Sequence, residues 1–303
     1  MSEGAPLPLS GWIILDKPLG LGSTQAVSAV KRALREAGAA KTRVGHGGTL
    51  DPLATGVLPI ALGEATKLAG RMLDAVKAYD FTVSFGVQTD TLDAEGVAVA
   101  TSEHRPGAEE VAAVLERFTG PIEQMPPAYS ALKVDGRRAY DLARAGEEVV
   151  LKTRSVTVFS LVSQPCAGSV ETLTCSAVVS KGTYIRSLAR DIAIALGTVG
   201  HVTMLRRTQA GPFGLDRAIS LDFLGKAASA RELTRAILPF EAGLDDIPAL
   251  PVTPDQARQL RHGQRVVGLP VPAGLYVAKD GVVPVALVEA DAGDLRVVRG
   301  LNL

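Results

Sequence analysis

The sequence has few of the residues that commonly bind metal ions or form disulfides: two cysteines and four histidines among 303 residues. Cys166 and Cys175 are nine positions apart, without metal-ligand spacing, and such sparse cysteine usage is typical of a reducing compartment. The histidines are far apart and no His-Glu-x-x-His pattern occurs, so we predict that no metal ion is bound. The glycine-rich stretch of the chain does not end in the Gly-x-Lys-Ser/Thr pattern, which excludes a phosphate-binding P-loop.

Long apolar runs are absent as well. No run approaches the length of a membrane span, and the N-terminal MSEGAPLPLS has neither the basic nor the apolar region of a secretion signal. We therefore expect a soluble cytoplasmic protein with no membrane partner. Aromatic residues make up only 4% of the chain, but 47% is hydrophobic and the mean hydropathy is +0.20. This composition supplies a core for one large domain and a small one.

The chain lacks net charge, with 32 basic against 32 acidic residues. A zero balance by itself argues against a nucleic-acid partner. The charges are nevertheless sorted along the sequence. Residues 80–116 contain eight acids and one Arg, whereas 11–50 and 178–217 each contain six basic residues against two acids. The sorting leaves room for a basic face that binds nucleic acid.

The stretch GHGGTLDPLATG, residues 45–56, places one carboxylate beside open space. Pro52 biases Asp51 toward extended geometry, and the pair Gly47-Gly48 lets the backbone approach a ligand closely. The apolar run 57–62 follows at once, so the loop lies at the mouth of a core element, as loops that carry chemistry commonly do. The alternative is that Asp-Pro begins a turn or a helix, with Asp51 as the N-cap and Pro52 in the first helical position.

The longer stretch HGGTLDPLATGVLPIALGEATK resembles the TruB family of tRNA pseudouridine synthases, which isomerise uridine 55 in the T arm. The resemblance covers about residues 11–213. It implies an α+β protein with the pseudouridine synthase fold, in which a mixed, largely antiparallel sheet is flanked by helices. It also implies that Asp51 is the nucleophile, that the partner is the T-arm stem-loop of tRNA, and that a monomer needs no cofactor for this redox-neutral reaction.

Residues 77–85 alternate with period two, which predicts a strand with Tyr79 and Phe81 on one side. The strand pattern alone is consistent with Tyr79 as one more core aromatic. The family resemblance instead implies that its ring stacks on the target base and that its phenol reaches the reaction centre.

Residues 180–191 predict a turn at Gly182, a cap at Thr183 and then a helix. Arg186 lies in the first turn, where it opposes the helix dipole, so we expect it to pair with a carboxylate elsewhere. The resemblance names that partner as Asp51.

The resemblance implies four further residues beside the uridine: Lys17 braces the catalytic loop, His46 projects toward the space vacated by the flipped nucleotide, Tyr184 lies against the base and Leu205 walls the uracil pocket. From the residues alone, the alternatives are a solvated turn for Lys17, a structural loop residue for His46 and a core position for Leu205.

Other patterns predict a strand at 12–15, a helix capped by Ser23 and ending at Gly38, a helix at 106–118, and strands at 155–162, 170–179 and 201–213. Residues 121–153 interleave basic and aromatic side chains, which suits either a helical hairpin packed on its own domain or an RNA-gripping thumb. The family resemblance favours the thumb.

A Pro-rich change of composition at residue 248 predicts two domains, a catalytic one at 1–247 and a small β-rich one at 248–303 that resembles a PUA RNA-binding domain. Two other functions compete with the enzyme. One is a non-catalytic RNA-binding or RNA-folding protein on the same scaffold. The other is a sugar-acting hydrolase, which needs a second acid near Asp51, and the nearby loops offer no obvious one.

Overall fold

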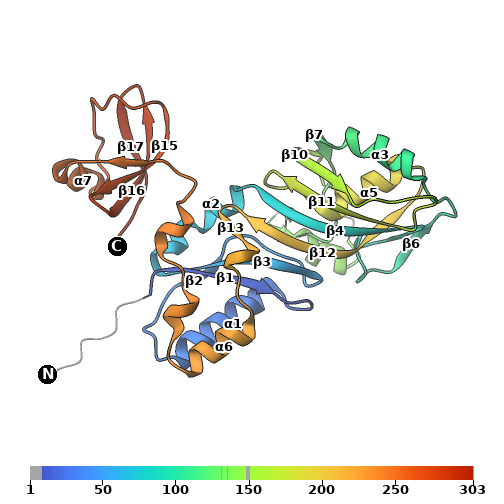
Figure 1. Cartoon of the computed structure of the whole chain (residues 1–303), viewed down its shortest axis with the longest axis horizontal. Helices are drawn as coiled ribbons and strands as arrows, with labels where there is room; N and C mark the ends of the chain where they lie inside the picture. Colours follow the sequence, from blue (N-terminus) through green and yellow to red (C-terminus); the bar gives the residue numbers. More distant parts are fainter. Residues whose placement is uncertain (1–8, 131, 135, 148–150, 303) are drawn as a thin grey trace.

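The computed structural model describes residues 9–130, 132–134, 136–147 and 151–302. Its centre is a nine-stranded mixed sheet in the order β1-β3-β12-β4-β11-β10-β7, with β2 paired to β3 and β13 to β12 (Figure 1). The strands are β1 (Gly11–Lys17), β2 (Val44–His46), β3 (Ala54–Leu62), β4 (Lys77–Phe85), β7 (Gly120–Gln124), β10 (Arg154–Ser163), β11 (Thr172–Val179), β12 (Gly200–Ala210) and β13 (Phe213–Gly214). All pairs are antiparallel except β3 with β12.

Two groups of helices cover different parts of this sheet (Figure 1). Helices α3 (Ala108–Arg117) and α5 (Ile185–Ala195) pack on β4, β10 and β11, whereas α1 (Ser23–Glu36) and α6 (Leu221–Ser229) pack on β1 and β3. Shorter elements connect them: α2 (Ala69–Asp74), η1 (Gly63–Leu68), η2 (Leu215–Arg217), η3 (Leu233–Ala236), η4 (Phe240–Gly243) and the strand pair β5 (Val87–Thr89) with β6 (Ala98–Thr101). Each group of helices forms a hydrophobic core with the strands that it covers, and the two cores define two halves of the central part of the molecule. Tyr79 and Leu205 contact both cores, so they lie where the two halves meet.

The predicted strands and helices at the centre of the chain are confirmed, but both predicted caps are wrong. The N-cap of α1 is Gly22, whose N–H is accepted by the Gln25 side chain at 2.8 Å. The N-cap of α5 is Tyr184, and Thr183 instead donates its hydroxyl to the Ser180 carbonyl. In both cases the helix begins one residue away from the predicted position.

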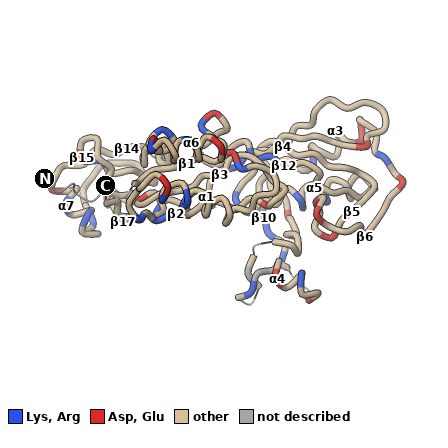
Figure 2. The backbone as a smooth tube through the Cα atoms, turned by 90° about the horizontal axis from the view of Figure 1, so that it is seen from below, with Lys and Arg blue, Asp and Glu red and all other residues tan. Residues whose placement is uncertain are grey.

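The segment predicted as a thumb divides into two parts. Residues 120–124 form β7 and belong to the central sheet. Beyond them, the strand pair β8 (Lys133–Val134) and β9 (Arg137–Arg138) leads into α4 (Ala139–Arg144), which stands away from the rest of the chain in Figure 2. Residues 131, 135 and 148–150 of the predicted thumb lie outside the described residues.

The C-terminal part forms a separate four-stranded sheet with its own core. Its elements are β14 (Ala249–Pro251), α7 (Pro254–Arg261), β15 (Gly274–Asp280), β16 (Val283–Asp291) and β17 (Asp294–Gly300). Val277 and Leu287 join a hydrophobic cluster around Trp12, so this small sheet is packed against the large one. None of the helices in the described part of the chain is long and apolar enough to cross a membrane.

Candidate active site

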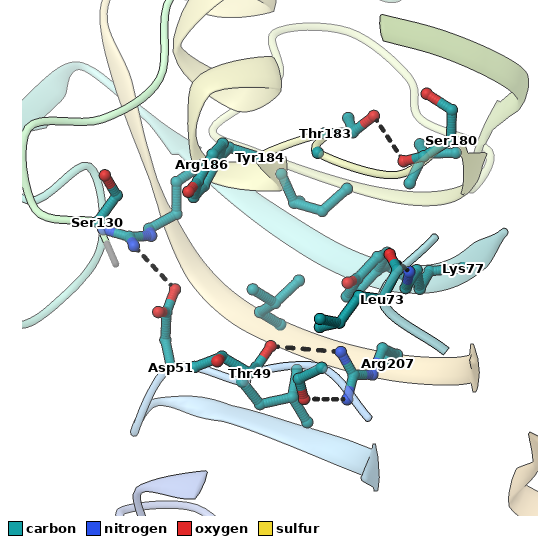
Figure 3. Close-up of a pocket in the computed structure, with 17 residues that line it drawn as sticks. Thr49, Asp51, Leu73, Lys77, Ser130, Ser180, Thr183, Tyr184, Arg186 and Arg207 are labelled. Atoms are coloured by element: carbon teal, nitrogen blue, oxygen red, sulfur yellow. Dashed lines mark hydrogen bonds and ion pairs between the residues drawn. The ribbon is translucent and has the colours of Figure 1, made fainter. Parts of the chain in front are cut away.

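Asp51 lies in the wall between two neighbouring cavities, with volumes of about 260 and 690 Å³. The smaller cavity also contains Tyr79 and Leu205, and the larger one contains His46. Asp51, from the loop before β3, points toward Arg186 at the start of α5 (Figure 3). A carboxylate in this position can reach a ligand in either cavity.

The backbone on both sides of Asp51 is held by buried groups. The Ser23 hydroxyl donates to the Leu50 carbonyl at 3.0 Å and accepts from the Leu50 N–H at 2.8 Å. On the other side, the Lys17 ammonium donates to the Pro52 carbonyl at 3.2 Å. The loop is therefore fixed immediately before and immediately after the residue whose side chain enters the cavities.

Two expectations about this loop are corrected. A turn begins at Asp51, closed by the Ala54 N–H, which donates to the Asp51 carbonyl at 3.0 Å. Strand β3 begins at Ala54, so the alternative in which Asp51 caps a helix is wrong. Gly47 does not face a ligand: a Cβ added there would lie 2.6 Å from Cβ of Met72. The absence of a side chain at Gly47 serves close packing of the loop on α2.

Arg186 joins the two halves of the molecule at the site. Its side chain is only 6% exposed, and its guanidinium lies 2.9 Å from Oδ2 of Asp51 and 3.6 Å from Oδ2 of Asp93. It also donates to the backbone carbonyls of Thr91 at 2.8 Å and Tyr129 at 2.9 Å. The predicted contact between residues 51 and 186 is present, and it orients a carboxylate whose own side chain is 39% exposed.

Arg207 is a second buried guanidinium beside the loop, and it has a different set of partners. It is 1% exposed and donates to three backbone carbonyls, those of Val57 at 2.7 Å, Gly48 at 3.1 Å and Thr49 at 3.3 Å. Its strand can come this close because Gly56 has no side chain: a Cβ there would lie 2.2 Å from the Arg207 carbonyl oxygen. Arg207 thus ties β12 to the segment that precedes Asp51.

Two tyrosines and a leucine are part of the apolar lining of the smaller cavity, together with Leu73, Val179 and Ile185. Tyr79, Tyr184 and Leu205 come from β4, the start of α5 and β12 respectively. The Gln124 side chain accepts from the Tyr184 N–H at 2.8 Å and donates to its carbonyl at 3.2 Å, which fixes the helix start. Burial raises the pKa of the Tyr184 phenol, so it is a neutral hydrogen-bond donor near pH 7.

His46 and Lys17 differ in whether they face a cavity. His46 lines the larger cavity, and its buried Nδ1 has no hydrogen-bond partner among the described residues. Burial lowers the pKa of His46, and the nearby Arg207 lowers it further. Lys17 is fully buried under the loop, and burial lowers the pKa of its ammonium to about 8 even though Asp51 acts in the opposite direction. His46 can therefore contact a ligand directly, whereas Lys17 acts through the loop.

The sequence did not reveal three of the residues at this site. Asp93 is a second acid close to Asp51, since both lie within 4 Å of Arg186, so the expectation that no nearby loop offers such an acid is wrong. Asp93 lies in a turn whose sequence indicates only an acidic loop, and Lys77 has the sequence of an ordinary strand residue. The family resemblance placed the basic pair Arg206-Arg207 along an RNA-facing strand, which is wrong for Arg207 because it is 1% exposed. The burial of Lys77 and Arg207 depends on strand pairing across the sheet, which no local pattern reports.

Comparison with known proteins identifies the family. The sequence profile of the TruB family pseudouridylate synthase N-terminal domain matches residues 32–185, and the profile of the tRNA pseudouridylate synthase B C-terminal domain matches residues 186–245. The chain is 63% identical over 298 residues to the tRNA pseudouridine synthase B of Novosphingobium aromaticivorans, covering 97% of this chain and 98% of the relative. The chain belongs to the TruB family of pseudouridine synthases.

Other TruB relatives and solved structures agree with this assignment. The chain is 57% identical to the tRNA pseudouridine synthase B of Zymomonas mobilis, over 97% of this chain and 96% of the relative. It is similar to a chain in a Cbf5-Nop10-Gar1 complex, with a TM-score of 0.69 and 28% identity over 92% of this chain and 78% of that one. A chain in an H/ACA RNP bound to a substrate RNA, 24% identical over 97% of this chain and 85% of that one, has the same fold with a TM-score of 0.72. The predicted pseudouridine synthase fold is confirmed, and membership favours an isomerase over a non-catalytic RNA-binding protein.

Proposed function

We propose that this TruB family member isomerises uridine 55 in the T arm of tRNA, with Asp51 as the catalytic carboxylate. The observation that carries the proposal is the ion pair of Asp51 and Arg186 at 2.9 Å in the wall between two cavities. A carboxylate fixed in this way can add to the sugar or base, or remove a proton from the sugar, as the glycosidic bond breaks. High identity to enzymes named tRNA pseudouridine synthase B supports the tRNA substrate.

The target uridine lies within a folded T loop, so it must turn outward to reach Asp51. We assign the smaller cavity to its base, with Tyr79 stacked on the ring and Tyr184 and Leu205 closing the pocket. The larger cavity, which His46 lines, takes the adjoining sugar-phosphate and neighbouring nucleotides. Lys17 supports the reaction indirectly through its contact with the Pro52 carbonyl.

The projecting segment around α4 is the proposed thumb. The guanidinium of Arg144 lies 4.6 Å from the ring centre of Tyr140, and the rings of Tyr129 and Tyr140 meet edge to face at 5.9 Å. Tyr129 and Tyr140 also line the larger cavity. Aromatic rings beside a cation suit unstacked RNA bases and their phosphates, which supports a role in gripping the T loop.

Three further parts of the proposal concern the whole chain. Residues 1–247 form the catalytic domain and residues 248–303 a PUA-like RNA-binding domain, which is supported by the separate core of the C-terminal sheet. The enzyme acts as a monomer and needs no cofactor, since the reaction rearranges one substrate without oxidation. Its tRNA substrate and two free thiols are consistent with a cytoplasmic location.

Asp51→Asn tests the assignment of the carboxylate. With a tRNA transcript carrying C5-tritiated uridine, we expect the variant to bind the tRNA but to release no tritium. The matched control is Asp222→Asn, because Asp222 is exposed on α6 and pairs with the nearby Lys226. Tritium release by Asp51→Asn at the rate of the control would refute the catalytic role of Asp51.

A further inference from the structure

Four cationic side chains are buried in the described part of the chain: Lys17, Lys77, Arg186 and Arg207. Buried charges in proteins are normally paired with an opposite charge. Within the described residues, only Arg186 has a carboxylate within 4 Å. The other three instead donate to backbone carbonyls, so the surroundings of the catalytic loop carry uncompensated positive charge.

Of these three residues, Lys77 is the one whose position suits direct contact with a ligand. It is 7% exposed and donates to the carbonyls of Leu73 at 2.5 Å and Ala75 at 2.7 Å. An ammonium has three N–H donors, so these two contacts leave one donor for another partner. The two acids closest in sequence have other partners: Asp74 pairs with Lys181 at 3.0 Å, and Asp80 accepts from the Ser176 hydroxyl at 2.6 Å.

The strand geometry places Lys77 in the same cavity as the proposed base-stacking residue. Lys77 and Tyr79 are two positions apart on β4 and therefore share a side of the strand, and both line the smaller cavity. Asp51 and Lys77 lie at opposite ends of that cavity, with Leu73 beside Lys77 (Figure 3). A base between them meets the carboxylate at one edge and the ammonium at the other.

We propose that Lys77 is a further catalytic residue that stabilises the negative charge on the uracil ring when its bond to the sugar breaks. This inference rests on the proposed function. When the C1′–N1 bond breaks, its electron pair goes to the ring and is shared by N1, O2 and O4. The ring then turns, C5 bonds to C1′, the C5 proton is lost and N1 gains a proton, so atoms and charge balance.

The shape of uracil explains why one cation at the far end of the cavity is useful in both halves of the reaction. In the six-membered ring, C4 lies opposite N1, and C2 lies opposite C5. With N1 near the sugar, O4 points toward Lys77. After the turn that brings C5 to the sugar, O2 points there instead. Both oxygens carry a share of the negative charge, so Lys77 faces an anionic oxygen before and after the rotation.

The charge state of Lys77 fits this role. Burial lowers its pKa to about 8, and the nearby Arg207 and Lys181 act in the same direction while Asp74 opposes them. The other titratable groups that face this cavity are Asp51, Tyr79, Tyr184 and Arg186. At pH 7 the ammonium is therefore charged, and it loses its proton as the pH rises through about 8.

The experiment compares the wild-type enzyme with Lys77→Gln and Lys77→Arg in single-turnover tritium release from a tRNA transcript, with Lys226→Gln, an exposed residue on α6, as the control. We expect Lys77→Gln to bind the transcript with little change in Kd but to react about 10²- to 10³-fold more slowly, which is the usual effect of removing a donor to a developing anion. Lys77→Arg keeps the charge and should recover part of the rate.

The pH profile separates catalysis from a merely structural role. The wild-type rate should fall above about pH 8. Because Lys17 has a similar pKa, the fall is assigned to Lys77 only if Lys77→Arg moves it to higher pH. A fall that stays in place in Lys77→Arg, or a rate for Lys77→Gln within threefold of the control, would overturn the inference. A wild-type enzyme without activity on uridine 55 would instead overturn the proposed function itself.

Discussion

Replacing Arg207 by methionine should loosen the catalytic loop and also remove one of the buried positive charges that line the smaller cavity. The guanidinium is 1% exposed and holds the carbonyls of Gly48, Thr49 and Val57. Methionine fills a similar space but donates no hydrogen bond. The segment that leads into Asp51 then loses its connection to β12, while the ion pair with Arg186 stays available.

The size of the effect follows from these three contacts. Arg207 donates to three buried carbonyls, and each carbonyl left without a donor costs about 1–3 kcal/mol before any relaxation. Relaxation recovers part of this cost, so we expect Arg207→Met to lower the free energy of unfolding by about 3–5 kcal/mol. Displacement of a catalytic group by about 1 Å costs roughly 10²-fold in rate, which is the expected loss in single-turnover tritium release.

A variant of similar stability separates loop placement from general destabilisation. Leu173→Ala removes a side chain that is 1% exposed in the core between the sheet and α5, and such a change costs about 2–5 kcal/mol. Both variants are compared by urea unfolding and by single-turnover rate at a temperature where each is folded. If Arg207→Met reacts as fast as Leu173→Ala, the guanidinium is only structural and the reasoning fails.

Two other predictions concern the surface and the thiols. Lys31, Arg32 and Arg35 are exposed on one face of α1, so the affinity for tRNA should weaken steeply as the salt concentration rises. In a filter-binding titration, log Kd should change with log salt by about 0.7–0.9 for each phosphate neutralised. A Kd that does not change with salt would exclude a basic face. Cys175 is fully buried, and burial raises the pKa of its thiol to about 12, whereas Cys166 is partly exposed. A disulfide reagent should therefore modify one thiol in the native protein and two in denaturant. Rapid modification of both thiols in the native state would contradict the packing around β11.

The parts of the fold that the sequence predicted are those with a local pattern. The alternation of residues 77–85 gives β4, and the apolar stripe around Val111 and Leu115 gives α3 within two residues of its expected ends. Caps were harder, because the Ser23 hydroxyl is used by Leu50, which is distant in sequence, instead of by its own helix. A side chain with a distant partner is not available for the local role that its type favours.

The candidate site shows the same division between local and distant information. An Arg in the first turn of a helix indicates that a carboxylate is needed, and Arg186 does meet acids. The residues alone did not identify them: Asp51 was named by family resemblance, and Asp93 was missed. Arg207 and its acceptor Val57 are 150 positions apart and meet only because β3 and β12 pair in parallel. No periodicity within either strand reports that pairing.

There is a physical reason why three of the buried cations donate to backbone carbonyls instead of carboxylates. Lys17, Lys77 and Arg207 need acceptors for their N–H groups, and carboxylates would supply them with stronger hydrogen bonds. Carboxylates would also cancel the positive charge around the cavity and repel a base that becomes anionic. Backbone carbonyls accept from most of these donors, leaving the third N–H of Lys77 available, and they keep the net charge in place. Burying these cations costs free energy of folding, but it creates an electrostatic environment around the cavity. That environment stabilises the anion formed during the reaction more than the neutral uridine that binds.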